Sequence, residues 1–221
     1  MQPPSTAEPV KILNVLLATD FSSASQTALL RALAFARRWH ARLFVAHVVN
    51  PSAIFGQEAV QRAVNDAWRE AHTQMTDQLI AGRLEGVENH VVVRSGEIWP
   101  ELQRMIAEFH IDLLVTGTRG RSGMWKMLMG STAEIIFRNS PIPVLTVGPR
   151  SPEQGRTEGP KRVLYATGFA AQSLYAGRFA FEIAERNQAQ LGMLHVVQSV
   201  PDNSTQARER LRRENEERQQ H

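Results

Sequence analysis

The sequence predicts an α/β protein whose parallel sheet is covered by helices on both faces. Two features lead to this prediction. Residues 10–147 contain short apolar runs that are nearly continuous, as is typical of strands buried on both faces. These runs alternate with stretches in which apolar residues recur every three or four positions, the spacing of an amphipathic helix. Such an alternation favours parallel strands joined by right-handed helical connections.

The first part of this region divides into two pairs of a strand and a helix. The first strand is expected at residues 10–19, and Asp20 and the serines after it can cap a helix at residues 25–40. The apolar face of that helix consists of Ala28, Leu29, Ala32, Leu33 and Ala36. A second strand is expected at residues 42–49. The long helix expected at residues 58–84 has an apolar face made of Val60, Val64, Trp68, Ala71, Met75 and Leu79.

The second part adds three strands and two helices. Valine-rich and leucine-rich runs predict the strands, and turn residues bound them. Pro100 suits the first turn of a helix because its missing N–H is not needed there. In chain order the expected elements are a strand at residues 90–94, a helix at 101–109, a strand at 112–116, a helix at 131–138 and a strand at 144–147.

The composition is that of a globular protein without cysteine chemistry. Of the 221 residues, 43% are hydrophobic and 21% are charged, which supplies enough apolar material for a core. The formal charge is only +3, so we expect no nucleic-acid partner. The chain contains no cysteine, which excludes disulfides, thiol nucleophiles and cysteine-bound zinc and is typical of a reducing compartment.

The sequence shows no signal for a membrane or for export. No segment approaches the roughly 20 consecutive apolar residues that a membrane helix needs, so we expect no membrane partner. Residues 1–9 lack the basic and apolar regions of a secretory signal and are expected to be a disordered leader. The predicted location is the cytoplasm.

The chain also contains an internal repeat. Shifted by 148 positions, residues 15–49 align with residues 163–197 without a gap, and 15 of the 35 pairs are identical. This predicts a tandem duplication. The expected organisation is a leader at residues 1–9, a complete domain at 10–149, a linker at 150–160, a partial β-α-β repeat at 161–200 and a charged helix or tail at 201–221.

A glycine-rich loop is the most informative motif. Gly117 and Gly120 are followed, nine residues further on, by Gly130 and Ser131 at the start of a predicted helix. Glycines let the backbone approach a ligand, and the free amides of a helix N-terminus attract phosphate. The spacing matches neither the Walker loop nor the GxGxxG dinucleotide motif. From the residues alone, a purely structural loop explains the pattern equally well.

Three separated segments together resemble the universal stress protein family. They are the glycine loop, the Ala-Thr-Asp-Phe-Ser segment at residues 18–22 and the His47-Val48 end of the second strand. The resemblance covers residues 10–149 and again residues 161–200. It implies a Rossmann-like sheet of the adenine nucleotide alpha hydrolase-like type, with five parallel strands in the order 3-2-1-4-5. Open α/β sheets bind ligands where the strand order reverses, here between the first and fourth strands.

The resemblance implies an ATP site in the first domain. In ATP-binding members of the family, the position of Asp20 lies against the nucleotide and the backbone at the Val48 position reads the adenine edge. The glycine loop and the Ser131 hydroxyl hold the ribose and phosphates, and Mg²⁺ or Mn²⁺ would be held through the phosphates. We expect no catalytic residue and no residue that binds the metal directly. The implied nucleotide-binding residues are Ala18, Thr19, Asp20, Val48, Gly117, Arg119, Gly120, Gly130, Ser131 and Thr132.

The implied function is ATP binding in stress response or signalling, with slow or no hydrolysis. The alternative is a dimerisation or interaction module of the same fold that binds no nucleotide. A group-transferring enzyme rests on fold analogy alone. In the resembled family the last strand pairs with a counterpart in another domain. Because the second copy lacks such a strand, we expect a homodimer through the edge strand Val144–Val147.

Several residues have a second interpretation. Asp20 could cap the first helix instead of, or besides, facing a ligand. His47 and His195 occupy matching strand ends and are interpreted as packing residues rather than ligands. In the second copy Gly168 stands where the first has Asp20, and no glycine loop follows, so no nucleotide site is expected there. The loop cations Arg121 and Lys126 could neutralise phosphate or simply be solvated, and Trp125 could cover the ligand or face a partner.

Overall fold

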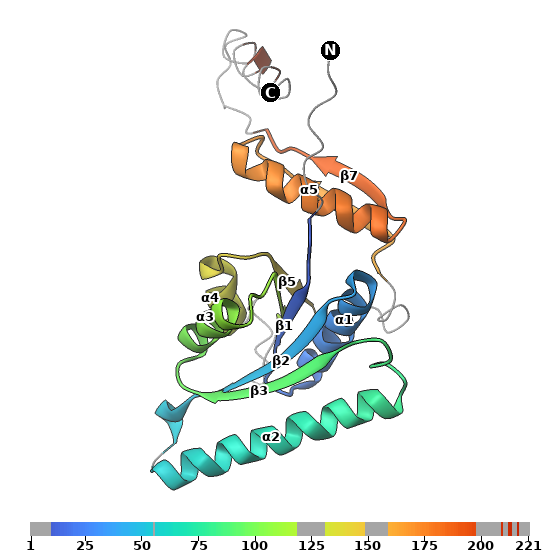
Figure 1. The fold of residues 1–221 in the computed structure, drawn as a ribbon. Coiled ribbons are helices and arrows are strands. Elements are labelled where there is room, and N and C mark those ends of the chain that lie inside the picture. The colour runs from blue at the N-terminus through green and yellow to red at the C-terminus, as the bar shows by residue number, and fades with distance from the viewer. Residues whose placement is uncertain are drawn as a thin grey trace. The chain divides into compact units, whose positions relative to one another are not determined.

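The computed structural model describes residues 10–54, 56–118, 131–148 and 159–197, together with Glu209, Arg212, Arg213 and Glu216 of the C-terminal segment (Figure 1). The chain divides into two compact units. The first unit is Lys11–Gly159, and the second unit is Pro160–His221 together with Met1–Val10.

The first unit contains a five-stranded parallel sheet in the order β3-β2-β1-β4-β5. The predicted fold class and strand order are therefore confirmed. The elements are β1 (Asn14–Ala18), α1 (Ser23–Trp39), β2 (Arg42–Val49), the short 3-10 helix η1 (Pro51–Ala53), α2 (Gln57–Ile80), β3 (Asn89–Ser95), α3 (Ile98–Glu108), β4 (Leu113–Gly117), α4 (Ser131–Asn139) and β5 (Val144–Val147).

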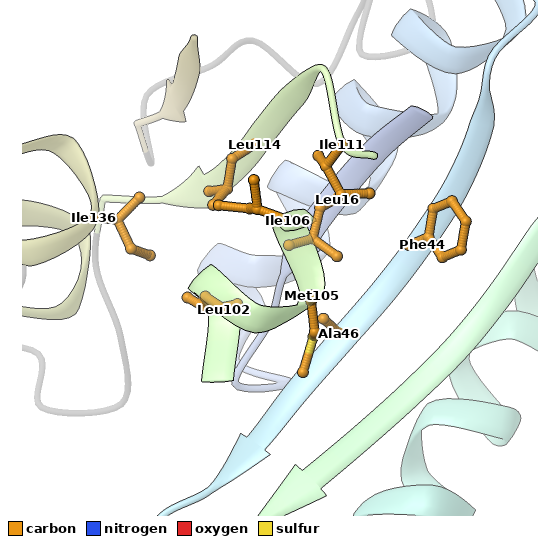
Figure 2. Packing of buried hydrophobic residues seen from close by; sticks show 9 residues of the cluster. All are labelled: Leu16, Phe44, Ala46, Leu102, Met105, Ile106, Ile111, Leu114 and Ile136. Atoms are coloured by element: carbon orange, nitrogen blue, oxygen red, sulfur yellow. The ribbon is translucent and has the colours of Figure 1, made fainter. Parts of the chain in front are cut away.

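One face of this sheet is covered by α3 and α4 (Figure 2). Leu16 of β1 and Leu114 of β4 are fully buried on it. The residues of the cluster are Leu16, Phe44, Ala46, Leu102, Met105, Ile106, Ile111, Leu114 and Ile136. Burying one large aliphatic side chain contributes about 1.5–3 kcal/mol, so this cluster is a main source of the stability of the first unit.

The opposite face is covered by α1, which packs on β1 and β4. Val15 and Leu17 alternate with Leu16 along β1 and are also fully buried, as a strand enclosed on both faces requires. The alanines predicted for the apolar face of α1, Ala28, Ala32 and Ala36, are completely buried, and their short side chains let the helix lie close to the sheet. Helix α2 packs on β2 and β3.

The start of β1 is fixed by a carboxylate. Asp112 Oδ2 accepts the N–H groups of Leu13 and Asn14 at 2.8 and 3.0 Å. Asn14 in turn donates its side-chain amide to the carbonyl of His110 at 3.0 Å. These bonds satisfy backbone groups where pairing begins, so the observed strand starts at residue 14, later than the apolar run at residue 10 suggests.

The second unit contains β6 (Arg162–Ala166), α5 (Ala171–Arg186) and β7 (Gln190–Leu194), with the two strands parallel. Helix α5 packs on β6 and β7. Leu164 occupies the position of Leu16 in the repeat alignment, yet 66% of its surface is exposed, whereas Leu16 has none exposed. Every residue of β7 is exposed as well. Among the described residues of this unit, no helix covers the face of the sheet that carries Leu164.

Within the described part of the chain, no helix is long and apolar enough to cross a membrane.

Candidate functional site

The predicted site lies at the carboxyl edge of the sheet, where the strand order reverses. Ala18, the last residue of β1, is aligned with Ala46 of β2 on one side and Thr116 of β4 on the other. Thr19 and Asp20 therefore leave the sheet beside the end of β4, which is Gly117. Open α/β sheets bind ligands at such a point.

The predicted site residues fall into three groups. Ala18, Thr19, Asp20, Val48 and Gly117 lie at the ends of β1, β2 and β4. Ser131 and Thr132 open α4, which connects two parallel strands and must run antiparallel to them, so its N-terminus points to the same edge. Arg119, Gly120 and Gly130 lie outside the described residues, as do Arg121, Trp125 and Lys126.

The carboxylate of Asp20 is held by the first turn of α1. Its Oδ1 accepts the N–H of Ser22 at 3.0 Å and the hydroxyl of Ser25 at 2.5 Å. The N-cap of α1 is Ser22, whose hydroxyl accepts the N–H of Ser25 at 3.3 Å. The capping role considered for Asp20 thus belongs to Ser22, and Asp20 is oriented by the cap.

Ser25 is a site residue that the sequence reasoning missed. Only 5% of its surface is exposed, and besides the bond to Asp20 Oδ1 its hydroxyl accepts the N–H of Asp20 at 3.3 Å. The internal repeat contained one indication that Ser25 matters, because Ser173 occupies the matching position in the second copy. A buried hydroxyl that contacts both the backbone and the carboxylate of one aspartate fixes the direction of that carboxylate.

The turn after β1 has a left-handed residue at its centre. Phe21 has φ 60°, which is unfavourable for a bulky side chain. Its N–H donates to Thr19 Oγ1 at 3.0 Å, and its ring stacks on that of His47 at a centroid distance of 4.7 Å. His47 Nδ1 lies 2.7 Å from the carbonyl oxygen of Thr19, and because a carbonyl only accepts, Nδ1 donates. We call Thr19, Phe21 and His47 the latch.

The side chains of Ala18 and Val48 point away from this edge. Both pack against the core cluster under α3 and α4. A ligand at the edge would therefore meet their main chain. The backbone role that the family resemblance implies for Val48 stays a prediction.

The start of α4 supplies positive potential. Ala133 and Ile136 are buried and anchor the helix, and Glu134 is paired with Arg138 at 2.9 Å, one turn further on. First-turn amides have no acceptor within their own helix, and together with the helix dipole they favour a phosphate group. Within the described ranges, no three histidine or acidic side chains come together in a way that could hold a metal ion.

Comparison with known proteins agrees with this fold. The model of the "Universal stress protein family" matches residues 11–148 and 159–221. The chain belongs to the universal stress protein family. A universal stress protein of Methanocaldococcus jannaschii is 27% identical over 136 residues, which are 60% of this chain and 80% of the relative. A putative universal stress protein of Staphylococcus aureus (strain USA300) is 28% identical over 143 residues, covering 61% and 82%.

A solved structure extends the likeness of fold to the second unit. The universal stress protein of Archaeoglobus fulgidus DSM 4304 has a TM-score of 0.61 and 22% sequence identity, and the match covers 91% of this chain and 72% of that one. The fold of a universal stress protein therefore accounts for most of the chain.

The second universal stress protein segment repeats the latch without the acid. Thr167 Oγ1 accepts the N–H of Phe169 at 3.0 Å, and His195 Nδ1 donates to the carbonyl of Thr167 at 2.7 Å. Phe169 has φ 58°, and its ring lies 4.6 Å from that of His195. Gly168, however, stands in the place of Asp20.

A tyrosine occupies the space around this second turn. The hydroxyl of Tyr165 donates to the carbonyl of Ser173 at 2.5 Å and lies 3.1 Å from Thr167 Oγ1. The corresponding residue of the first unit is Leu17, whose side chain has no hydrogen-bonding group. The second unit therefore ties its helix to its first strand through a phenol, where the first unit uses Asp20 and Ser25.

Proposed function

We propose that the first unit binds ATP, with Mg²⁺ or Mn²⁺ held through the phosphates, and that the protein acts in a stress response or in signalling in the cytoplasm. The observation that supports this proposal best is the meeting of three features at one sheet edge. They are the oriented carboxylate of Asp20, the main chain of Val48 and the N-terminus of α4. These features suit the ribose, the base and the phosphates, in that order.

The base selectivity follows from the direction of the Val48 main chain. Along β2, Arg42 donates its N–H to Leu13 and Ala46 accepts from Thr19, so alternate residues face β1. Val48 continues this series beyond the end of β1. Its N–H and C=O present a donor and an acceptor side by side. Along the edge that carries N7, adenine offers an acceptor and an amino donor, whereas guanine offers two acceptors, so a ligand bound by this edge satisfies both groups only if it is adenine.

The phosphates would lie toward α4 and the glycine loop. A triphosphate at a helix N-terminus gains from the free amides and from the dipole. We propose that Gly117, Arg119, Gly120, Gly130, Ser131 and Thr132 surround it, as the resemblance implied. Slow or no hydrolysis is part of this proposal, as the resemblance implied.

The test is to release and identify bound nucleotide. Freshly purified protein is denatured and the supernatant is analysed by mass spectrometry, followed by calorimetric titration with Mg·ATP. We expect ATP or ADP from the wild type and loss of binding in the Gly117→Asp/Gly130→Asp variant, because added carboxylates repel phosphates. Gly168→Asp is the matched control, since a Cβ there meets no atom within 4 Å and the second unit lacks the site. Failure of the wild type to bind Mg·ATP at millimolar concentration would refute the proposal.

The edge strand β5 supports a homodimer. Within the described first unit, β5 pairs only with β4 and leaves its other edge open. Ile135 and Phe137 of α4, the helix next to it, are 47% and 62% exposed. An open strand edge beside apolar side chains is typical of an interface. We propose that two copies pair through Val144–Val147.

The exposed apolar residues of the second unit favour an interaction role as a second candidate function. Besides Leu164, the exposed large apolar residues there are Leu174, Tyr175, Phe181, Leu191, Met193, Leu194, Val196 and Val197. We propose that this unit is the partial second copy of a tandem duplication and serves contacts with protein rather than with nucleotide. Retention of all phenotypes by a variant that has lost nucleotide binding would favour this role for the whole protein.

A further inference from the structure

The latch interrupts the pairing of β1 and β2 at a defined point. Arg42 is aligned with Asn14, and it donates its N–H to the carbonyl of Leu13, the residue before Asn14. Continued six residues along both strands, the same pattern would direct the N–H of Val48 to the carbonyl of Thr19. That carbonyl instead accepts a hydrogen bond from His47 Nδ1 at 2.7 Å.

The other half of the expected pairing is interrupted as well. Thr19 donates its N–H to the carbonyl of Ala46, so Phe21, two residues on, would donate to the carbonyl of Val48. The N–H of Phe21 bonds to Thr19 Oγ1 instead, at 3.0 Å. In the described ranges, no backbone hydrogen bond joins Val48 to Thr19 or to Phe21.

We infer that His47 is a positioning residue for base recognition: its imidazole holds the Thr19 carbonyl out of pairing with the Val48 N–H and so leaves that N–H to bind adenine. This inference rests on the proposed function. The ring of His47 also stacks on Phe21, which holds the left-handed turn that aims Asp20. One side chain thus connects the group that recognises the base with the turn that carries the acid, although it touches no ligand itself.

The stack of His47 on Phe21 and its bond to Thr19 can be separated by substitution. His47→Phe keeps a ring that can stack on Phe21 but removes the donor to Thr19. His47→Asn keeps an N–H donor at the position of Nδ1 but removes the ring. His195→Phe makes the same change in the second latch, where Gly168 replaces the acid, and is the matched control for any loss of stability.

The first measurement is amide hydrogen exchange of Val48 in the full chain without nucleotide. In His47→Phe the Thr19 carbonyl is no longer held by the imidazole, so we expect the Val48 N–H to bond to it and to exchange more slowly than in the wild type. General loosening of the structure has the opposite effect, because it speeds exchange throughout. His47→Asn should exchange at Val48 like the wild type. Unchanged or faster exchange at Val48 in His47→Phe overturns the inference.

The second measurement is calorimetric titration with Mg·ATP and Mg·GTP. We expect His47→Phe to bind Mg·ATP about tenfold more weakly, equivalent to about 1.4 kcal/mol, and to lose preference for it over Mg·GTP. His47→Asn should retain most of the wild-type affinity, and His195→Phe all of it. Equal loss of affinity in His47→Phe and His195→Phe would show a merely structural role and overturn the inference.

The two measurements separate this inference from the proposed function. If the wild type binds neither nucleotide, the proposed function fails, and with it the role of His47 in base recognition. The exchange data still decide whether His47 keeps the Val48 N–H from pairing with Thr19. If the wild type binds Mg·ATP and His47→Phe binds it equally well with slowed exchange at Val48, the inference fails while the proposed function stands.

Discussion

Ser25→Ala tests whether the direction of the Asp20 carboxylate is set by a buried hydroxyl. The substitution removes a donor to Asp20 Oδ1 at 2.5 Å and an acceptor for the Asp20 N–H at 3.3 Å. A hydrogen bond to a charged group contributes about 1.5–3 kcal/mol to stability. Because the removed atom is small and Ser25 is 5% exposed, little packing is lost, and we expect the free energy of unfolding of the first unit to fall by about that amount.

The assay is thermal and urea unfolding followed by circular dichroism, together with titration of Mg·ATP. At about 2–4 °C per kcal/mol for a chain of this size, the melting temperature should fall by roughly 3–12 °C. Nucleotide affinity should fall severalfold, since the carboxylate is no longer oriented. Ser173→Ala is the control, because the bond from Tyr165 to Ser173 uses the backbone carbonyl and survives the substitution.

A double-mutant cycle with Asp20→Ala isolates the pair. If Ser25 acts through the carboxylate, Ser25→Ala should cost clearly less in the Asp20→Ala background than in the wild type, with a coupling within the range of about 0.5–3 kcal/mol seen for contacting residues. Identical losses in both backgrounds, or equal losses for Ser25→Ala and Ser173→Ala, would refute the reasoning.

Three further outcomes can be checked in the same chain. Gly96→Ala should destabilise the first unit by about 1–3 kcal/mol in urea unfolding, because the added Cβ would lie 2.5 Å from Oε1 of the buried Glu101. That carboxylate is held in place by an ion pair with Arg104 at 3.0 Å. Gly168→Ala should not destabilise the protein, because no atom lies within 4 Å of the added Cβ. Asp112→Ala should cost about 1–3 kcal/mol in the same assay, because two strand amides lose their acceptor. Ile135→Lys/Phe137→Lys should leave folding unchanged but halve the mass measured by light scattering, and an unchanged mass would exclude α4 from the proposed dimer interface.

Much of the first unit follows from local sequence. Strands enclosed on both faces are apolar at most positions, so the runs of β1 and β4 were recognisable without tertiary information. Strands β2 and β5 occupy the predicted residues, 42–49 and 144–147. The sequence predicted the ends of helices less accurately than the positions of strands. Helix α2 ends at Ile80 rather than at residue 84, because a turn containing Gly82 and Gly86, both with positive φ, follows it.

The roles of residues at the site depended more on register. Asp20 and Val48 could be placed at the carboxyl edge because strand ends meet there in any parallel sheet. Ser25 could not be distinguished from the other serines around it, since only its burial between helix and turn gives it two bonds to Asp20. The packing role assigned to His47 describes its stack on Phe21 but omits its bond to Thr19.

The sequence by itself determined the alternation of elements, the repeat and the loss of the acid at Gly168, because each is a property of residue types and spacing. The tertiary structure alone decided how the latch works. Thr19 and His47 are 28 residues apart, and whether an imidazole or a backbone amide reaches that carbonyl depends on the register of β1 against β2 and on the turn at Phe21. It also decided that Leu164 is exposed where Leu16 is buried, since burial requires a covering helix as well as an apolar side chain.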